Sequence, residues 1–360
     1  MDGRTALGLR LSSLLLRGNA PSSVGEIVSW FGAMQAQDVN SILWSLGARL
    51  PGWTLEDVNA ALEKRDVLRT WPMRGTVHLV PSVDAHWMLE LMGSRALAGA
   101  AKRRETLGLD EQTAEKAVDL LGFALAGGRR MTRAECMVTL TEGGVEVGGQ
   151  RGYHLLWYAA QRGVTAIAPH VGKEQTFVLL DDWVPEPSRP ERDEALGLIA
   201  LRYFRSHGPA TRKDFAGWTG LTMGDCKTGI AAAGDELSVV DVDGVEMIAS
   251  TAALDAASSF AGWLALSGFD EYMLGYKDRS LMASADDLAA IIPGGNGVFQ
   301  STLVRDGRVV ATWKRVLGAR GVTVTVLPLA SLTARDARAV EKALAPFASF
   351  LGVPLTVKNP

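Results

Sequence analysis

The feature that most constrains the fold is a recurring order of segments, in which helices are followed by a two-stranded hairpin. Helical apolar spacing ends near Lys64, Gln161 and Ala233, and each time two short alternating strands follow. The paired strands are expected at 67–71 and 76–80, at 164–168 and 176–180, and at 237–241 and 245–249. Helices followed by a hairpin are typical of a winged helix, so the sequence predicts three of them in tandem.

The last hundred residues have a different character. Alternating strands are expected at 297–304, 308–315 and 322–327, followed by an amphipathic helix at 331–351 and a short strand at 355–358. The first two strands flank Arg305-Asp306-Gly307, a tight-turn signal. We therefore expect an α+β protein: winged-helix 1 at 1–83, winged-helix 2 at 84–185, winged-helix 3 at 190–252, and a β-rich, barrel-like C-terminal module at 253–360.

Composition limits the class of protein. The chain has 37 Lys and Arg against 40 Asp and Glu, a net charge of −3, which argues against a general nucleic-acid coat because bulk DNA affinity comes from neutralising phosphates. A basic face would have to come from clusters such as Lys102-Arg103-Arg104 and Arg129-Arg130; each is equally readable as a solvated helix end or loop. Without an apolar run of about 18 residues, we expect an intracellular protein with no membrane partner.

Two glutamines at the end of a predicted helix are the first candidate for chemistry. A helix is expected to open near Ser22 and to close in Met34-Gln35-Ala36-Gln37-Asp38. Residues two apart cannot share one face of an ideal helix, so Gln35 and Gln37 can do so only where the helix ends and the chain extends. Such a terminus could hold a water molecule against a substrate. Ordinary solvated or capping residues are the alternative.

Several long segments carry a resemblance to a known family. They are Gln35-Ala36-Gln37, the stretch from Val67 through Trp71-Pro72-Met73-Arg74-Gly75 to Val80, Phe269-Asp270-Glu271-Tyr272 through Arg279, and Asp306-Gly307-Arg308 with Thr312-Trp313-Lys314. With them the chain resembles the bacterial winged-helix DNA glycosylases of the AlkZ/YcaQ-like group, from about residue 8 to the end. Gln35-Ala36-Gln37 fits the Gln-aliphatic-Gln branch of that group.

The resemblance implies a monofunctional DNA glycosylase that hydrolyses the N-glycosidic bond of N7-alkylated purines, in DNA repair or in self-resistance to a DNA-alkylating natural product. Bulky adducts and interstrand cross-links belong to the implied substrates. It implies a monomer acting on double-stranded DNA with alkylated bases, without metal or organic cofactor, in the bacterial cytoplasm at the nucleoid. Gln35 and Gln37 would position the water. Asp38 is an alternative base or a helix cap, and His78 a contact to the substrate or a structural residue.

The candidate DNA contacts are mainly basic residues near predicted hairpins and helix ends. They are Arg69, Trp71, Arg74, Lys102, Arg103, Arg104, Arg129, Arg130, Arg305 and Arg308. Two other functions compete with the glycosylase: a winged-helix transcription regulator and a non-catalytic DNA-adduct binding protein. Three non-identical wings in one chain without a coiled-coil seam argue against the regulator, which normally needs a dimer.

Overall fold

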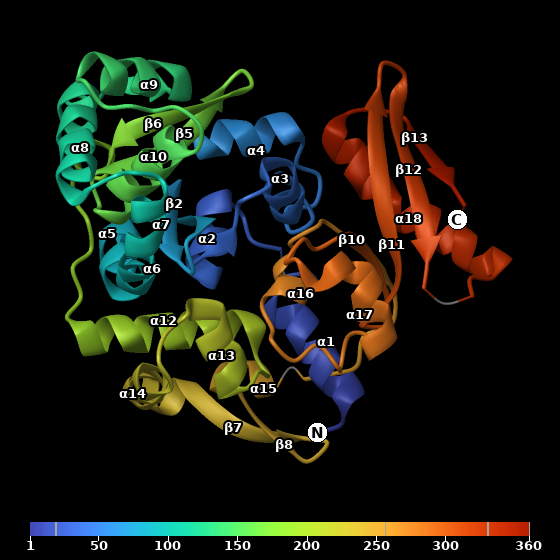
Figure 1. The fold of residues 1–360 in the computed structure, drawn as a ribbon. Helices are drawn as coiled ribbons and strands as arrows, with labels where there is room; N and C mark the ends of the chain where they lie inside the picture. Colours follow the sequence, from blue (N-terminus) through green and yellow to red (C-terminus); the bar gives the residue numbers. More distant parts are fainter. Residues whose placement is uncertain (19, 256, 330, 360) are drawn as a thin grey trace. The chain divides into compact units, whose positions relative to one another are not determined.

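The computed structural model describes residues 1–18, 20–255, 257–329 and 331–359 (Figure 1). Asn19, Ala256, Ala330 and Pro360, the last three inside the predicted C-terminal module, lie outside the described residues. The chain forms two compact units that interleave in sequence. Unit 1 consists of Met1–Ala61, Leu196–Trp218 and Thr222–Pro360, and unit 2 of Leu62–Ala195 and Thr219–Leu221. The predicted division into four segments follows sequence pattern, and it stays a prediction.

Unit 1 holds most of the helices and the longest strands. Its helices are α1 (Gly3–Ser13), α2 (Val24–Phe31), α3 (Val39–Gly47), α4 (Leu55–Leu62), α12 (Arg192–His207), α13 (Arg212–Thr219), α14 (Met223–Ala233), α15 (Thr251–Leu254), α16 (Glu271–Leu274), α17 (Ala285–Ile291) and α18 (Ala334–Leu351). Its strands are β1 (Met34–Gln35), β7 (Leu237–Val242), β8 (Val245–Ser250), β9 (Trp263–Leu266), β10 (Ser301–Arg305), β11 (Arg308–Gly318), β12 (Gly321–Pro328) and β13 (Leu355–Lys358).

Unit 2 is built around a sheet, and its helices alternate with the strands of this sheet along the chain. Its elements are β2 (Val67–Met73), β3 (Thr76–Pro81), α5 (Ala85–Met88), α6 (Ser94–Gly99), α7 (Ala101–Thr106), α8 (Glu111–Leu125), β4 (Arg130–Thr132), α9 (Arg133–Glu142), α10 (Arg151–Gln161), β5 (Thr165–Val171), β6 (Glu174–Leu179) and α11 (Leu180–Trp183). The predicted order of helices followed by a hairpin is confirmed three times, at β2–β3, β5–β6 and β7–β8.

The helices begin where short polar side chains can cap them. The Ser23 hydroxyl accepts the Glu26 N–H at the start of α2, and Thr132 with Glu135 forms a complete capping box at α9. A Ser or Thr followed three residues later by Glu is a general sequence signal for the start of a helix. The helices between residues 85 and 106 have no such cap, and the sequence did not predict them.

The first two hairpins join in one sheet. Within unit 2 the strands follow the order β3-β2-β5-β6-β4, and β2 pairs with β5 antiparallel, with Arg69 opposite Ile167. Every residue of β2 is buried, as expected for a strand with neighbours on both sides. The first two predicted wings are therefore continuous with each other instead of separate.

The C-terminal strands form an open sheet in the order β13-β12-β11-β10-β9. All neighbours are antiparallel except β12 and β13, which are parallel. Helix α18 packs on this sheet through Phe347, whose ring lies 5.1 Å from those of Trp313 on β11 and Trp44 on α3. Within the described residues β9 and β13 have no partner to close the sheet, so the expected barrel-like closure is not confirmed.

Candidate active site and DNA interface

The glutamine motif lies on an extended segment. Helix α2 ends at Phe31, earlier than expected, because Gly32 adopts φ 80° and terminates it. The chain then forms the two-residue strand β1, which contains Gln35, and bends at Gln37 before α3 begins. Gln35 and Gln37 can share a face only where the chain is extended, and the backbone at Gln35 is extended. Gln35 is 9% exposed, whereas Gln37 is exposed.

Asp38 caps the helix that follows the motif. Its carboxylate accepts a hydrogen bond of 2.7 Å from the Ser41 N–H, at the start of α3. The cap interpretation is therefore confirmed, while a catalytic part for Asp38 stays a prediction. Arg315 on β11 lies within electrostatic range: burial lowers the pKa of its guanidinium, and the Asp38 carboxylate partly opposes that shift.

One buried carboxylate is bonded to this segment, and a second buried carboxylate is its neighbour in the sequence. The Glu271 Oε1 atom accepts the backbone N–H of Gln35 at 3.0 Å. Its neighbour Asp270 pairs with Arg49 at 2.9 Å and accepts the Ser45 hydroxyl at 2.6 Å. Both acids belong to the segments that carry the family resemblance, but neither had a predicted role. No spacing signal could have linked residue 271 to residue 35.

His78 is a buried structural residue of unit 2. It is 0% exposed on β3, and its ring nitrogens lie 2.9 Å from the Thr76 carbonyl oxygen and 3.2 Å from Arg74 Nη2. The hydrogen-bonding interpretation of this histidine is confirmed. Direct contact of His78 with a substrate stays a prediction. Its neighbour Arg74 is exposed at the hairpin turn, with φ 54°, and could link the buried ring to a bound substrate.

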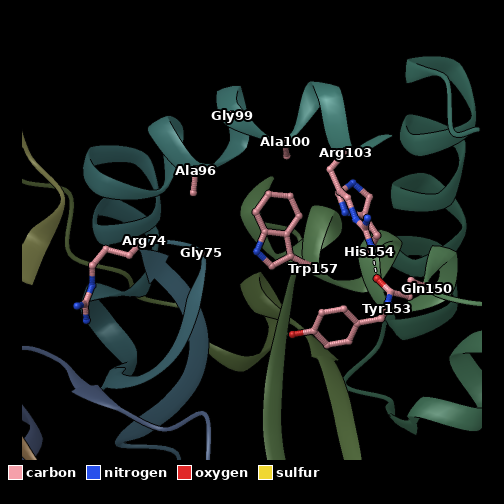
Figure 2. A pocket seen from close by; sticks show the side chains of 10 residues that line it. All are labelled: Arg74, Gly75, Ala96, Gly99, Ala100, Arg103, Gln150, Tyr153, His154 and Trp157. Atoms are coloured by element: carbon pink, nitrogen blue, oxygen red, sulfur yellow. Dashed lines mark hydrogen bonds between the residues drawn. The ribbon is translucent and has the colours of Figure 1, made fainter. Parts of the chain in front are cut away.

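A pocket next to the β2–β3 turn brings together two of the predicted DNA contacts. It has a volume of about 370 Å³ and is lined by Arg74, Gly75, Ala96, Gly99, Ala100, Arg103, Gln150, Tyr153, His154 and Trp157. Figure 2 shows Arg74 and Arg103 at opposite ends of it, with the Trp157 indole between them. Burial lowers the pKa of His154, and the Arg104 and Arg103 charges act in the same direction. The pocket thus combines cationic side chains with aromatic rings and an imidazole.

Two of the predicted contacts are held in the interior of unit 2. Trp71 is 1% exposed, because β2 is covered on both faces. Arg69 is 8% exposed and lies 3.0 Å from His170 Nδ1, and burial lowers its pKa to about 10. A tryptophan beside a turn is accessible only if its own strand is at the surface, and β2 is an internal strand. Their contact with DNA stays a prediction, and because both residues are buried we leave them out of the proposed interface.

The other basic residues of unit 2 differ in how far they are already engaged. Arg130 forms two bonds to the Glu63 carboxylate, of 3.0 and 3.1 Å, and Arg104 lies over the Tyr158 ring at 5.1 Å. Lys102 and Arg129 are exposed. Arg103 donates to the Gln150 amide oxygen. Engaged arginines can still contact a phosphate, but only by giving up a partner, so we expect Lys102 and Arg129 to respond to DNA more readily than these arginines.

The predicted hairpin tip at Arg305 and Arg308 is packed into unit 1. Arg305 pairs with Asp336 at 3.3 Å, Arg308 donates to the Leu281 carbonyl oxygen at 3.1 Å, and Gly307 is buried against Leu7. The next hairpin is the exposed one. The tip of β11–β12 carries Val316 and Leu317, which are 70% and 62% exposed. This tip was not among the predicted DNA contacts, although two aliphatic residues before Gly318-Ala319-Arg320-Gly321 are a signal that the sequence offers.

Neither a metal cluster nor a membrane span is found in the described part of the chain. Among its residues, no three His, Cys, Asp or Glu side chains gather in a way that could hold a metal ion. No helix within the same ranges is long and apolar enough to cross a bilayer. Whether the reaction needs a cofactor is a separate question, and the expectation of none stays a prediction.

The chain and its fold match a DNA glycosylase family. A family model described as DNA glycosylase AlkZ-like matches residues 28–350, so the chain belongs to this family and is a DNA glycosylase, a hydrolase. It is similar to the interstrand DNA cross-link repair glycosylase of Streptomyces sahachiroi, with 28% identity over 373 residues, 97% of this chain and 96% of that protein. The structure of Streptomyces sahachiroi DNA glycosylase AlkZ matches with a TM-score of 0.82 and 25% identity, over 99% of this chain and 100% of that one.

Proposed function

We propose that this glycosylase releases N7-alkylated purines from double-stranded DNA, with Gln35 and Gln37 positioning the attacking water. Alkylation at N7 makes the purine ring cationic, so the leaving group is activated before the enzyme acts. The C1′–N9 bond breaks with its electron pair moving onto the base, which becomes neutral. The water oxygen bonds to C1′ and its proton passes to solvent. The enzyme then needs positioning and electrostatics more than a strong acid.

The side chains of the motif suit this task. A glutamine amide oxygen accepts a hydrogen bond from water and its NH₂ group donates to sugar or phosphate, but it cannot take up a proton as a base does. The single observation that carries the proposal is Gln35-Ala36-Gln37 on an extended segment immediately before the capped helix α3, in a chain of this family. We expect little activity on neutral, undamaged bases.

We propose that the three sets of helices and hairpin are winged helices that hold the duplex. Arg74 and Arg103 with their pocket, and Lys102 and Arg129, would contact phosphates in unit 2. The name of the Streptomyces sahachiroi relative supports an extension to interstrand cross-links. Repair of general alkylation damage and self-resistance to an alkylating natural product are both compatible with this substrate class. We propose a monomer, working at the bacterial nucleoid.

The test is release of N7-methylguanine from a labelled duplex, beside an undamaged duplex of the same sequence. We expect release of the methylated base only. No release, together with tight binding to one defined undamaged sequence, would contradict the proposal and favour a regulator. Selective binding to the methylated duplex without release would contradict it in favour of an adduct-binding protein.

A further inference from the structure

The buried carboxylate of Glu271 connects three elements of unit 1 at the glutamine motif. The side chain is 1% exposed at the start of α16. Its Oε1 atom accepts the Gln35 backbone N–H at 3.0 Å, from β1. Its Oε2 atom accepts the Trp218 indole N–H at 3.0 Å, from α13, and lies 3.2 Å from His207 Nε2, on α12. The motif is thus tied to the core through one carboxylate.

The chemistry of these partners requires an acceptor on both oxygens of residue 271. A backbone N–H and an indole N–H can only donate hydrogen bonds. A carboxylate satisfies both donors, whereas a neutral amide offers one oxygen and one NH₂ group. Leaving a buried donor without a partner is costly, so Glu271 is matched to its position in a way that an isosteric glutamine is not.

We propose that Glu271 is a positioning residue that fixes the backbone of Gln35 and thereby aims the glutamine motif at the water; the proposal rests on the proposed function. The bond from the Gln35 backbone N–H to this carboxylate ties the motif directly to Glu271. Displacement of a catalytic group by about 1 Å can cost about a hundredfold in rate. The hydrogen bond from the Gln35 N–H to Glu271 holds the short extended segment in place and so limits such a displacement.

The support behind the carboxylate is itself rigid. His207 is 0% exposed, stacks on the Tyr203 ring at 4.6 Å with 13° between the planes, and has Nδ1 2.8 Å from the Ser206 hydroxyl. The Trp218 ring packs 5.2 Å from Tyr203 as well. Glu271 is therefore held by side chains that cannot rotate freely, which is what a positioning residue needs.

The experiment compares Glu271→Gln with wild type in single-turnover release of N7-methylguanine. We expect a rate lower by about tenfold to a hundredfold, with Kd for the methylated duplex unchanged, because the motif is misplaced while the DNA contacts remain. The matched control is Asp270→Asn. That carboxylate is next in sequence and 2% exposed, and it holds Arg49 and Ser45 instead of the motif. At a temperature where both variants are folded, the control is expected to keep most of the wild-type rate.

Rescue separates positioning from general packing. In Glu271→Gln with Trp218→Phe the indole N–H is gone, so the amide nitrogen can face His207 and the amide oxygen can accept from Gln35. We expect this double variant to release base faster than Glu271→Gln alone. If Glu271→Gln does not fold, Glu271→Asp replaces it in the experiment. The shorter side chain keeps the charge but cannot bond to Gln35 and Trp218 at the same time. The rate should again fall with Kd unchanged.

Three results would overturn the inference: a wild-type rate in Glu271→Gln or its replacement Glu271→Asp, an equal loss in the folded Asp270→Asn control, or no rescue in a folded double variant. Wild type that releases no base would instead overturn the proposed function. The two failures are therefore distinguishable in one assay.

Discussion

The buried ion pair between Arg49 and Asp270 gives a prediction about stability that can be worked out from the structure. Their side chains are 0% and 2% exposed, and the guanidinium makes two bonds to the carboxylate, of 2.9 and 3.1 Å. Removing one partner leaves the other charge buried without compensation, which costs about 3–5 kcal/mol. We therefore expect Asp270→Asn to lower the free energy of unfolding by about that amount at pH 7.

Removing both charges should cost less than the sum of the two single changes. In Arg49→Met with Asp270→Asn no charge is left unpaired, and the two residues are in direct contact. We expect a coupling free energy of about 3 kcal/mol, the upper end of what contacting residues show. Urea unfolding of the full chain, followed by circular dichroism, measures the three variants against wild type.

The same pair predicts how the difference depends on pH. Burial alone would raise the pKa of Asp270, but the Arg49 charge and the hydrogen bonds from Arg49, Ser45 and the Tyr272 N–H outweigh it, and the pKa lies below 3.8. A lowered carboxyl pKa contributes stability that is present above the unfolded-state pKa of about 3.9 and is lost as the pH falls below it. The difference between wild type and Asp270→Asn should therefore shrink below about pH 4. A loss of unfolding free energy in Asp270→Asn of less than about 1 kcal/mol at pH 7, or a loss that does not depend on pH, would show that the ion pair does not contribute as expected.

Three further predictions concern the surface and a buried thiol. Arg74→Ala should weaken binding to duplexes of any sequence and lower the slope of log K against log salt by about 1, measured by fluorescence anisotropy. Arg130 is already paired with Glu63, so Arg130→Ala should change the affinity and this slope less. Val316→Ser with Leu317→Ser should slow base release while changing the free energy of unfolding by no more than about 0.5 kcal/mol, since an exposed apolar tip can wedge between base steps; an unchanged rate would contradict this. Burial raises the pKa of Cys136 to about 12, so this thiol should stay unreactive toward iodoacetamide at pH 8 until urea unfolds the chain, and rapid labelling of the native protein would contradict it.

Local patterns predicted the elements of this fold well because their causes are local. The cap at Thr333 and the amphipathic spacing behind it place α18 at Ala334–Leu351, close to the helix expected at 331–351. The turn at Asp306-Gly307 has positive φ at both residues, of 51° and 79°, as the tight-turn signal requires. What the sequence could not show is which hairpins share a sheet: the pairing of β2 with β5 joins residues about a hundred positions apart.

The two glutamines of the site could be predicted from the sequence, whereas Glu271, which is bonded to Gln35, could not. Gln35 and Gln37 stand out because two amides at this spacing need an extended chain, and the chain is extended at Gln35. Glu271 reaches Gln35 only after the chain has folded back over 236 residues. The burial of Trp71 was not predictable for a related reason: nearness to a turn is a local property, whereas burial depends on the surrounding elements.

The most direct test of the proposed mechanism is single-turnover release of N7-methylguanine by wild type, Gln35→Ala and Gln37→Ala, with Kd for the same duplex determined in parallel. We expect release by wild type and a rate lower by about a hundredfold or more in at least one variant, at unchanged Kd. Release that neither substitution slows would contradict it and place the water-positioning groups elsewhere in the chain.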